Sequence, residues 1–74
     1  MTTGTVVRII RDRGFGFIRP EPEGEDIFFH ASAVADGRFD ALEEGVRVEF
    51  EQVRDARGRG MRAENVYPLG VAGR

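Results

Sequence analysis

Near its N-terminus the chain carries the segment Arg13-Gly14-Phe15-Gly16-Phe17-Ile18-Arg19, in which two aromatic residues alternate with other side chains between arginines. In a β-strand, alternate side chains point to the same face. Phe15 and Phe17 therefore share one face, and Gly16 and Ile18 share the other. Ile18 is the natural core residue, which leaves the two rings on the outer face. Rings between basic side chains suit stacked bases beside a charged backbone, so the segment predicts a surface for single-stranded nucleic acid.

A second aromatic segment, Asp26-Ile27-Phe28-Phe29-His30, has the same alternation. If Ile27 and Phe29 fill the core, Phe28 and His30 lie outside. One turn joins the two segments, so we expect them to pair. Four side chains would then form one exposed patch of the kind that marks a binding site: Phe15, Phe17, Phe28 and His30. The alternatives are that the phenylalanines are core residues of a tightly wound barrel and that His30 is a surface histidine without a contact.

Five short segments have the β-branched or alternating composition typical of strands. They are Thr5–Arg11, Phe15–Arg19, Asp26–His30, Gly45–Glu51 and Met61–Tyr67. Residues 31–34 are expected to form a short helical turn, and residues 36–44 a longer connection. Closing five strands into a barrel removes the exposed edges of a flat sheet. The sequence therefore predicts an all-β, five-stranded antiparallel barrel over residues 1–68, with a flexible tail at residues 69–74.

The chain has 74 residues, no cysteine and a formal net charge of −2, so we expect one domain without disulfides. No apolar run is long enough for a membrane span or a signal peptide. We therefore expect a cytoplasmic protein without a membrane partner, most simply a monomer, although a dimer stays open. His30 has no second histidine or cysteine with which to hold a metal. His30 and Ser32 are too close in sequence for a catalytic pair, so we expect neither an enzyme nor a cofactor.

Positive charge is concentrated in two arginine-rich stretches within an acidic background. The first holds Arg8, Arg11, Arg13 and Arg19, and the second holds Arg54, Arg57, Arg59 and Arg62. An acidic connection, residues 21–26, separates the two aromatic segments. It is either a solvated loop or a region that repels phosphate. Arg57-Gly58-Arg59-Gly60 is either a solvated hairpin turn or an RNA-binding arginine-glycine segment.

Several segments together resemble a bacterial cold-shock protein, the single-domain form of the cold-shock domain. Arg13 to Ile18 is similar to that family's first ribonucleoprotein motif, and Ile27 to His30 to its second. Further similar segments are Gly4-Thr5-Val6, Leu42-Glu43-Glu44-Gly45 and Ala63-Glu64-Asn65-Val66. The resemblance runs from about Gly4 to Val66 and depends on two motifs in the right order and spacing.

The resemblance implies a five-stranded OB-fold barrel that binds single-stranded RNA or DNA with little sequence preference and acts as an RNA chaperone. The family's stacking residues correspond to Phe15, Phe17, Phe28 and His30. Phe39 matches a further aromatic in the long loop, where an anchor beneath the loop is an equal alternative. Phosphate contacts are expected from Arg8, Arg13 and Arg19, with Arg57 and Arg59 as outer contacts.

The chain departs from the family pattern in three places, one of them the conservative replacement of a lysine by Arg13, and it lacks two or three of the family's ring platforms. Arg8-Ile9-Ile10 stands where the family usually has Trp-Phe-Asn, and Ala31 replaces an aromatic after the second motif. A guanidinium plane can stack on a base, so Arg8 would replace one ring in part. We expect binding that is weaker and more salt-dependent than is typical for the family. The alternative function is a protein-interaction module with weakened nucleic-acid binding.

Overall fold

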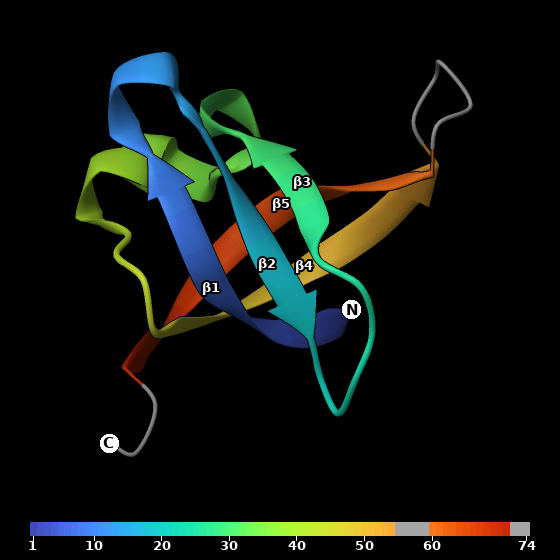
Figure 1. The fold of residues 1–74 in the computed structure, drawn as a ribbon. Helices are drawn as coiled ribbons and strands as arrows, with labels where there is room; N and C mark the ends of the chain where they lie inside the picture. The colour runs from blue at the N-terminus through green and yellow to red at the C-terminus, as the bar shows by residue number, and fades with distance from the viewer. Residues whose placement is uncertain (55–59, 72–74) are drawn as a thin grey trace.

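The structure, a computed structural model, describes residues 1–54 and 60–71. Five strands form a closed barrel in the order β1-β2-β3-β5-β4 (Figure 1). Their bounds are β1 Thr2–Ile10, β2 Phe15–Pro20, β3 Ile27–His30, β4 Val46–Arg54 and β5 Met61–Val71. Three 3-10 helices connect them: η1 Arg11–Arg13, η2 Ala31–Ala33 and η3 Ala35–Ala41. The closed five-stranded barrel expected from the sequence is confirmed.

One strand pair differs from the antiparallel expectation. β3 and β5 run parallel, with Phe28 opposite Arg62, whereas the four other neighbouring pairs are antiparallel. The reason is geometric: a ring with an odd number of strands cannot reverse direction at every step. The parallel pair places β5 beside the second aromatic segment.

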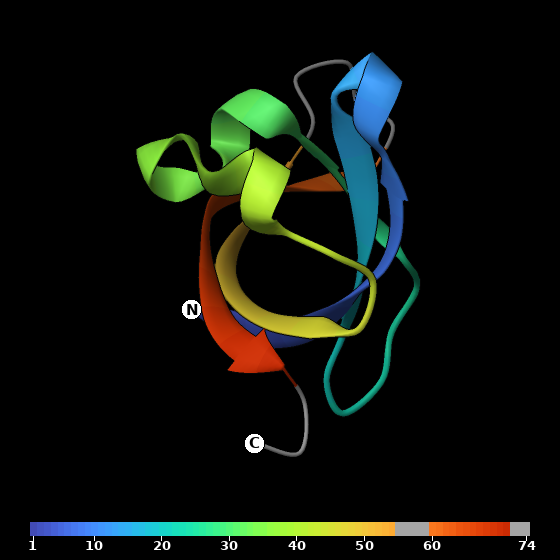
Figure 2. The same ribbon diagram turned by 90° about the vertical axis from the view of Figure 1, so that its left-hand side faces the viewer.

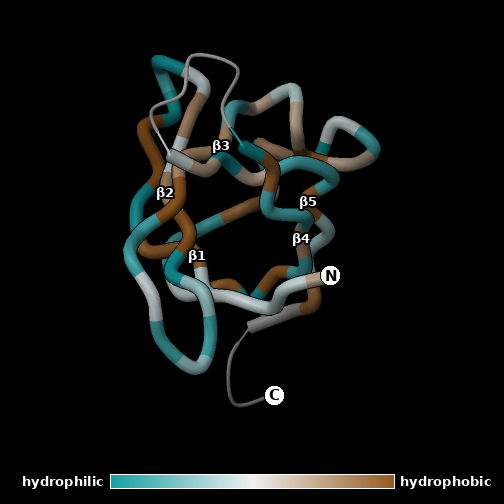
Figure 3. Tube along the Cα trace, turned by 90° about the vertical axis from the view of Figure 1, so that its right-hand side faces the viewer, coloured by the Kyte–Doolittle hydropathy of each residue, from teal (hydrophilic) through white to brown (hydrophobic). Residues whose placement is uncertain are grey.

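The barrel interior is apolar, and its largest fully buried side chains come from all five strands and from the connection after η3. They are Phe29, Phe50, Ile18, Leu42, Val6, Val48 and Val66. The connection between β2 and β3 is hydrophilic by contrast (Figure 3). The inward assignment of Ile18, Ile27 and Phe29 is confirmed, since each is buried.

Four strands are longer than expected, and β2 exceeds its predicted length only by Pro20. β1 begins at Thr2, because Thr2 to Thr5 pair with β4. β4 continues to Arg54, and β5 continues to Val71 through its pairing with Val46 and Arg47. The tail expected from Leu69 is therefore wrong for residues 69–71, while residues 72–74 lie outside the described residues.

The segment after β3 gathers at one end of the barrel (Figure 2). η2 is the short helical turn expected from the sequence, and η3 occupies most of the expected long connection. Arg11 ties this segment to the end of β1, because its guanidinium donates to the carbonyls of Asp40 at 3.0 Å and Leu42 at 2.8 Å. A longer contact of 3.4 Å reaches the carbonyl of Phe39. Among residues 1–54 and 60–71, no helix has the length and apolar character needed to cross a membrane.

Candidate nucleic-acid interface

Four side chains on β2 and β3 form one outward surface, here called the aromatic face: Phe15, Phe17, Phe28 and His30. Pairing of β2 with β3 sets Phe15 opposite His30 and Phe17 opposite Phe28. The three rings touch as a group, with centroid distances of 6.0 Å for Phe15–Phe17, 5.6 Å for Phe15–Phe28 and 6.1 Å for Phe17–Phe28. The two motifs therefore build a single surface, as the alternation predicts.

The glycine between the two β2 rings is required by close packing. A Cβ atom at Gly16 would lie 2.6 Å from the carbonyl oxygen of Arg8 and 2.9 Å from the Phe29 ring. Such contacts are too short for any side chain to be accommodated without movement of β1 or the core. Gly16 thus lets β1 and β2 approach over Phe29, while its two neighbours project outward.

The four side chains differ in how far they reach solvent. Phe28 is 38% exposed and His30 is exposed. Phe15 and Phe17 are half-buried, because each packs edge-to-face or tilted against the other rings. The alternative of fully buried core phenylalanines is therefore wrong for all three. The face is an open apolar surface of touching rings.

The imidazole of His30 is oriented by the start of η2. Its Nδ1 accepts the backbone N–H of Ser32 at 3.1 Å and lies 2.9 Å from the Ser32 hydroxyl oxygen. Because Nδ1 is the acceptor, a neutral ring carries its proton on Nε2. The local hydrogen bonds hold the ring at the edge of the aromatic face.

A bulge in β1 brings Arg8 onto this surface. The register shifts between Val6 and Arg8, so that Val6 pairs with Ile18 inside the barrel and Arg8 pairs with Phe17 outside. Across the sheet, successive partners then form one row from β1 to β5: Arg8, Phe17, Phe28 and Arg62. Arg8 is exposed. The row places an arginine on each side of two aromatic rings.

Arg62 was not among the nucleic-acid-binding residues predicted from the sequence, which placed it only in the second arginine-rich stretch. Its neighbour Ala63 is only 1% exposed, so the alternation along β5 directs Arg62 outward. The sequence did not predict that β5 pairs with β3, because no sequence pattern indicates a parallel pairing between strands so far apart in the chain. Alternation alone could have indicated an outward Arg62, but not its position beside Phe28.

The other arginines predicted to contact phosphate differ in their exposure and in their ion pairs. Arg13 is exposed on η1, next to the start of β2. Arg19 lies at the far end of β2, and its Nε donates to the carboxylate of Asp26 at 3.0 Å. That ion pair reduces the positive charge available to a phosphate at Arg19. Arg57 and Arg59 lie outside the described residues.

Phe39 is a correction to the predicted site. It is 7% exposed, and its ring packs against the buried Phe29 at a centroid distance of 6.1 Å. A ring in that position cannot offer a face to a base. Phe39 is the hydrophobic anchor beneath the connection, which was the alternative left open by the sequence.

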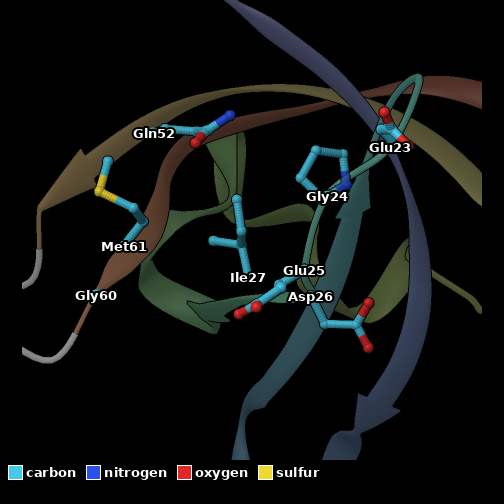
Figure 4. Close-up of a pocket in the computed structure, with 9 residues that line it drawn as sticks. Glu23, Gly24, Glu25, Asp26, Ile27, Gln52, Gly60 and Met61 are labelled. Atoms are coloured by element: carbon cyan, nitrogen blue, oxygen red, sulfur yellow. The ribbon is translucent and has the colours of Figure 1, made fainter.

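The end of the barrel near the β2–β3 connection is acidic. A pocket of about 320 Å³ there is lined by residues that include Glu23, Glu25 and Asp26, together with Ile27 and Met61 (Figure 4). Carboxylates repel the phosphates of a nucleic acid. The pocket therefore bounds the aromatic face rather than extending it.

An ion pair fixes the first residue of the same connection. Arg47 donates through Nη2 to Glu21 Oε1 at 2.9 Å and through Nε to Oε2 at 3.2 Å. Thr5 donates its hydroxyl to Oε2 at 3.2 Å. The hydrogen bond from Arg47 is the main cause that lowers the pKa of the Glu21 carboxyl below its usual value. The contacts tie the connection to β1 and β4.

A closed five-stranded barrel with touching aromatic rings and arginines on one outward face defines a class, the OB-fold nucleic-acid-binding domains. A sequence model of the 'Cold-shock' DNA-binding domain matches residues 2–69. The chain belongs to this family of nucleic-acid-binding proteins. Neither the match nor the names of its relatives indicate an enzyme.

Curated relatives cover nearly the whole chain. The chain is 48% identical over 69 residues to cold shock-like protein CspLB of Listeria monocytogenes, a match that covers 93% of this chain and 100% of that protein. It is 46% identical over 69 residues to cold shock-like protein CspA of Stigmatella aurantiaca, with 93% and 98% covered. It is 46% identical over 66 residues to cold shock-like protein CspE of Escherichia coli, with 89% and 93% covered.

Proposed function

We propose that this chain binds single-stranded RNA or DNA with little sequence preference and acts as an RNA chaperone. The bases stack on Phe15, Phe17, Phe28 and His30, and the backbone runs past Arg8 and Arg13. One observation carries the proposal: three touching rings and an oriented imidazole lie on one outward face of the barrel, beside exposed arginine.

Base stacking supplies most of the affinity in this proposal. Stacking on an aromatic side chain contributes about 1–3 kcal/mol per base and tolerates any base, because every base has a π-face. Arg8 lies opposite Phe17, where its guanidinium adds a planar and positively charged contact. Ile9 and Ala31 offer no such plane, so the surface has fewer stacking positions than a typical member of the family.

Chaperone activity follows from mass action. A protein that binds unpaired strands, but not paired ones, shifts a weak hairpin toward its open form as protein concentration rises above the dissociation constant. No cofactor takes part in such a step. The effect is greatest for weak secondary structure, since the shift in free energy grows only with the logarithm of protein concentration.

Fluorescence anisotropy with end-labelled heptamers tests the proposal. A label is needed because the chain has no tryptophan. We expect saturable binding of dT7 and U7 at low salt, weaker binding of the corresponding duplex, and opening of a short labelled hairpin at the same protein concentrations. Absence of binding at tens of micromolar protein in low salt would contradict it. That result would favour the alternative in which the aromatic face binds a protein partner.

A further inference from the structure

The border of the aromatic face on β5 holds an ion pair that the two aromatic motifs do not include. Arg62 pairs in register with Phe28, and its Nε donates to Oε2 of Glu64 at 2.7 Å. The side chains are 33% and 36% exposed, so the pair is half-buried yet accessible from solvent. The bond fixes the direction of the Glu64 carboxylate.

Strand geometry places both side chains on the same surface as the rings. Arg62 and Glu64 are two residues apart, and Ala63 between them is buried, so both project outward from β5. β5 is the strand next to β3 in the barrel, at a spacing of about 4.8 Å. A base that stacks on Phe28 can therefore turn one edge toward Arg62 and toward the Glu64 carboxylate that Arg62 holds.

The pair offers a base edge both kinds of polar partner. A carboxylate has about four lone-pair positions, and the bond from Arg62 uses one of them. Guanine carries two adjacent donors, N1–H and the N2 amino group, next to the acceptor O6. Its donors match the carboxylate, and O6 is attracted by the positive charge of Arg62. Thymine and uracil instead carry a single N–H between two carbonyl oxygens, of which one would face the carboxylate unfavourably.

We propose that Glu64, oriented by Arg62, makes the position above Phe28 selective for guanine within an otherwise sequence-tolerant surface. The inference rests on the proposed function, since a base must first stack on Phe28. Adenine and cytosine fit less well than guanine, because their pairing edges carry one amino donor and no adjacent imino N–H. A charged carboxylate that accepts two hydrogen bonds from one base discriminates more strongly than a single neutral bond.

The experiment compares dT7 with heptamers in which a single guanine replaces thymine at each position in turn. Wild-type protein is expected to bind the best guanine heptamer at least fivefold more tightly than dT7. In Glu64→Gln the ratio falls below twofold, while dT7 still binds. Glu49→Gln is the matched control. It removes one carboxylate from the outer side of β4, where Glu49 pairs with Thr3 and Tyr67, and leaves the ratio unchanged.

A second arm uses only the wild-type chain, so it does not depend on how a variant folds. Inosine in place of guanine lacks the N2 amino group and is expected to lose at least half of the preference. A wild-type ratio near one would overturn the guanine assignment. So would an equal change of affinity for all heptamers in Glu64→Gln, which indicates a general charge effect. Failure of every heptamer to bind wild type would instead overturn the proposed function itself.

Discussion

Phe28 and Phe29 are adjacent in sequence and serve opposite surfaces of the barrel. Phe28 is 38% exposed and touches Phe15 and Phe17, whereas Phe29 is fully buried and packs against Phe39. The alternation of a strand makes this division unavoidable once one of the two faces the core. The pair therefore separates the contribution of the binding surface from that of the core.

Phe28→Ala is expected to weaken binding of dT7 by about 1–3 kcal/mol, roughly 5–150-fold, because a stacking platform is lost. Its free energy of unfolding should fall less than it would for loss of a fully buried ring, since Phe28 is 38% exposed but contacts Phe15 and Phe17. Phe29→Leu is the matched control and should lower the free energy of unfolding by roughly 1–2 kcal/mol through lost core packing. Anisotropy titrations and urea unfolding measure the two quantities. Equal effects of both variants on affinity would contradict the assignment of faces.

The rings of this site could be predicted from the sequence because strand alternation determines their direction. Ile18 and Phe29 mark the inside, and their neighbours must then lie outside. Phe39 could not be placed in the same way, because it lies in η3, where no two-residue period applies. Its burial follows from packing on Phe29, which is a tertiary contact.

Among the elements, η1 joins β1 to β2, and its two arginines differ in their contacts. Arg11 donates to carbonyls in the connection that follows β3, whereas Arg13 is exposed two residues later. Gly14 ends η1 in the left-handed region at φ 74°, which glycine adopts without strain. The turn thus anchors one end of the barrel and exposes one cation two residues before Phe15.

Arg11→Ala and Arg13→Ala are expected to have opposite consequences. Loss of Arg11 removes charge-assisted bonds to the carbonyls of Asp40 and Leu42 and should lower the free energy of unfolding by about 1–2 kcal/mol. Its folded form should keep most of its affinity. Loss of Arg13 should leave stability within about 0.5 kcal/mol and weaken oligonucleotide binding. Urea unfolding and anisotropy at one salt concentration separate the two, and a stability loss in Arg13→Ala alone would reverse the assignment.

The Glu21–Arg47 contact predicts a dependence of stability on pH. Because the pKa of Glu21 is lowered in the folded chain, its contribution is present above the unfolded carboxyl pKa of about 4.3. It is lost as the pH falls through the lower folded value. Glu21→Gln should therefore unfold at lower urea than wild type at pH 6, and the two midpoints should converge as the pH approaches 3. A difference that persists unchanged at pH 3 would show that the ionised carboxylate is not responsible.

The sequence predicted which segments form strands, but it did not predict the register in which the strands pair. The β1 bulge at Val6–Arg8 is set by pairing with β2, and it moves Arg8 to the outer face. The parallel contact of β3 with β5 follows from closure of five strands into a ring. Both features are properties of the whole barrel, so the row from Arg8 to Arg62 emerges only from the structure.

At the scale of the whole molecule, the arrangement of charge matters more than its sum. The chain has a net charge of −2, yet Arg8 pairs in register with Phe17, and the exposed Arg13 lies two residues before Phe15 in the sequence. Glu23, Glu25 and Asp26 are among the residues that line the pocket at the β2–β3 connection, and Asp26 pairs with Arg19. A bound strand is therefore expected to follow the rings and to end before this acidic end of the barrel.

The affinity for an oligonucleotide should accordingly fall as the salt concentration rises. With two to four phosphate contacts, the logarithm of the association constant should fall against the logarithm of salt concentration with a slope of roughly −1.5 to −3. Arg13→Gln should make the slope shallower by about 0.7, the value for one contact on a single strand. Arg38→Gln, which removes an exposed arginine from η3, serves as the control and should leave the slope unchanged. An affinity independent of salt would contradict the assigned phosphate contacts.

NMR chemical-shift changes during a titration with unlabelled dT7 show which residues of the barrel contact the oligonucleotide. The largest changes are expected at the ring and backbone signals of Phe15, Phe17, Phe28 and His30. Tyr67 and Leu69, exposed apolar residues further along β5, should change little. Changes centred on Tyr67 and Leu69, or saturable binding that leaves the four predicted residues unaltered, would contradict the proposal that the aromatic face binds the oligonucleotide.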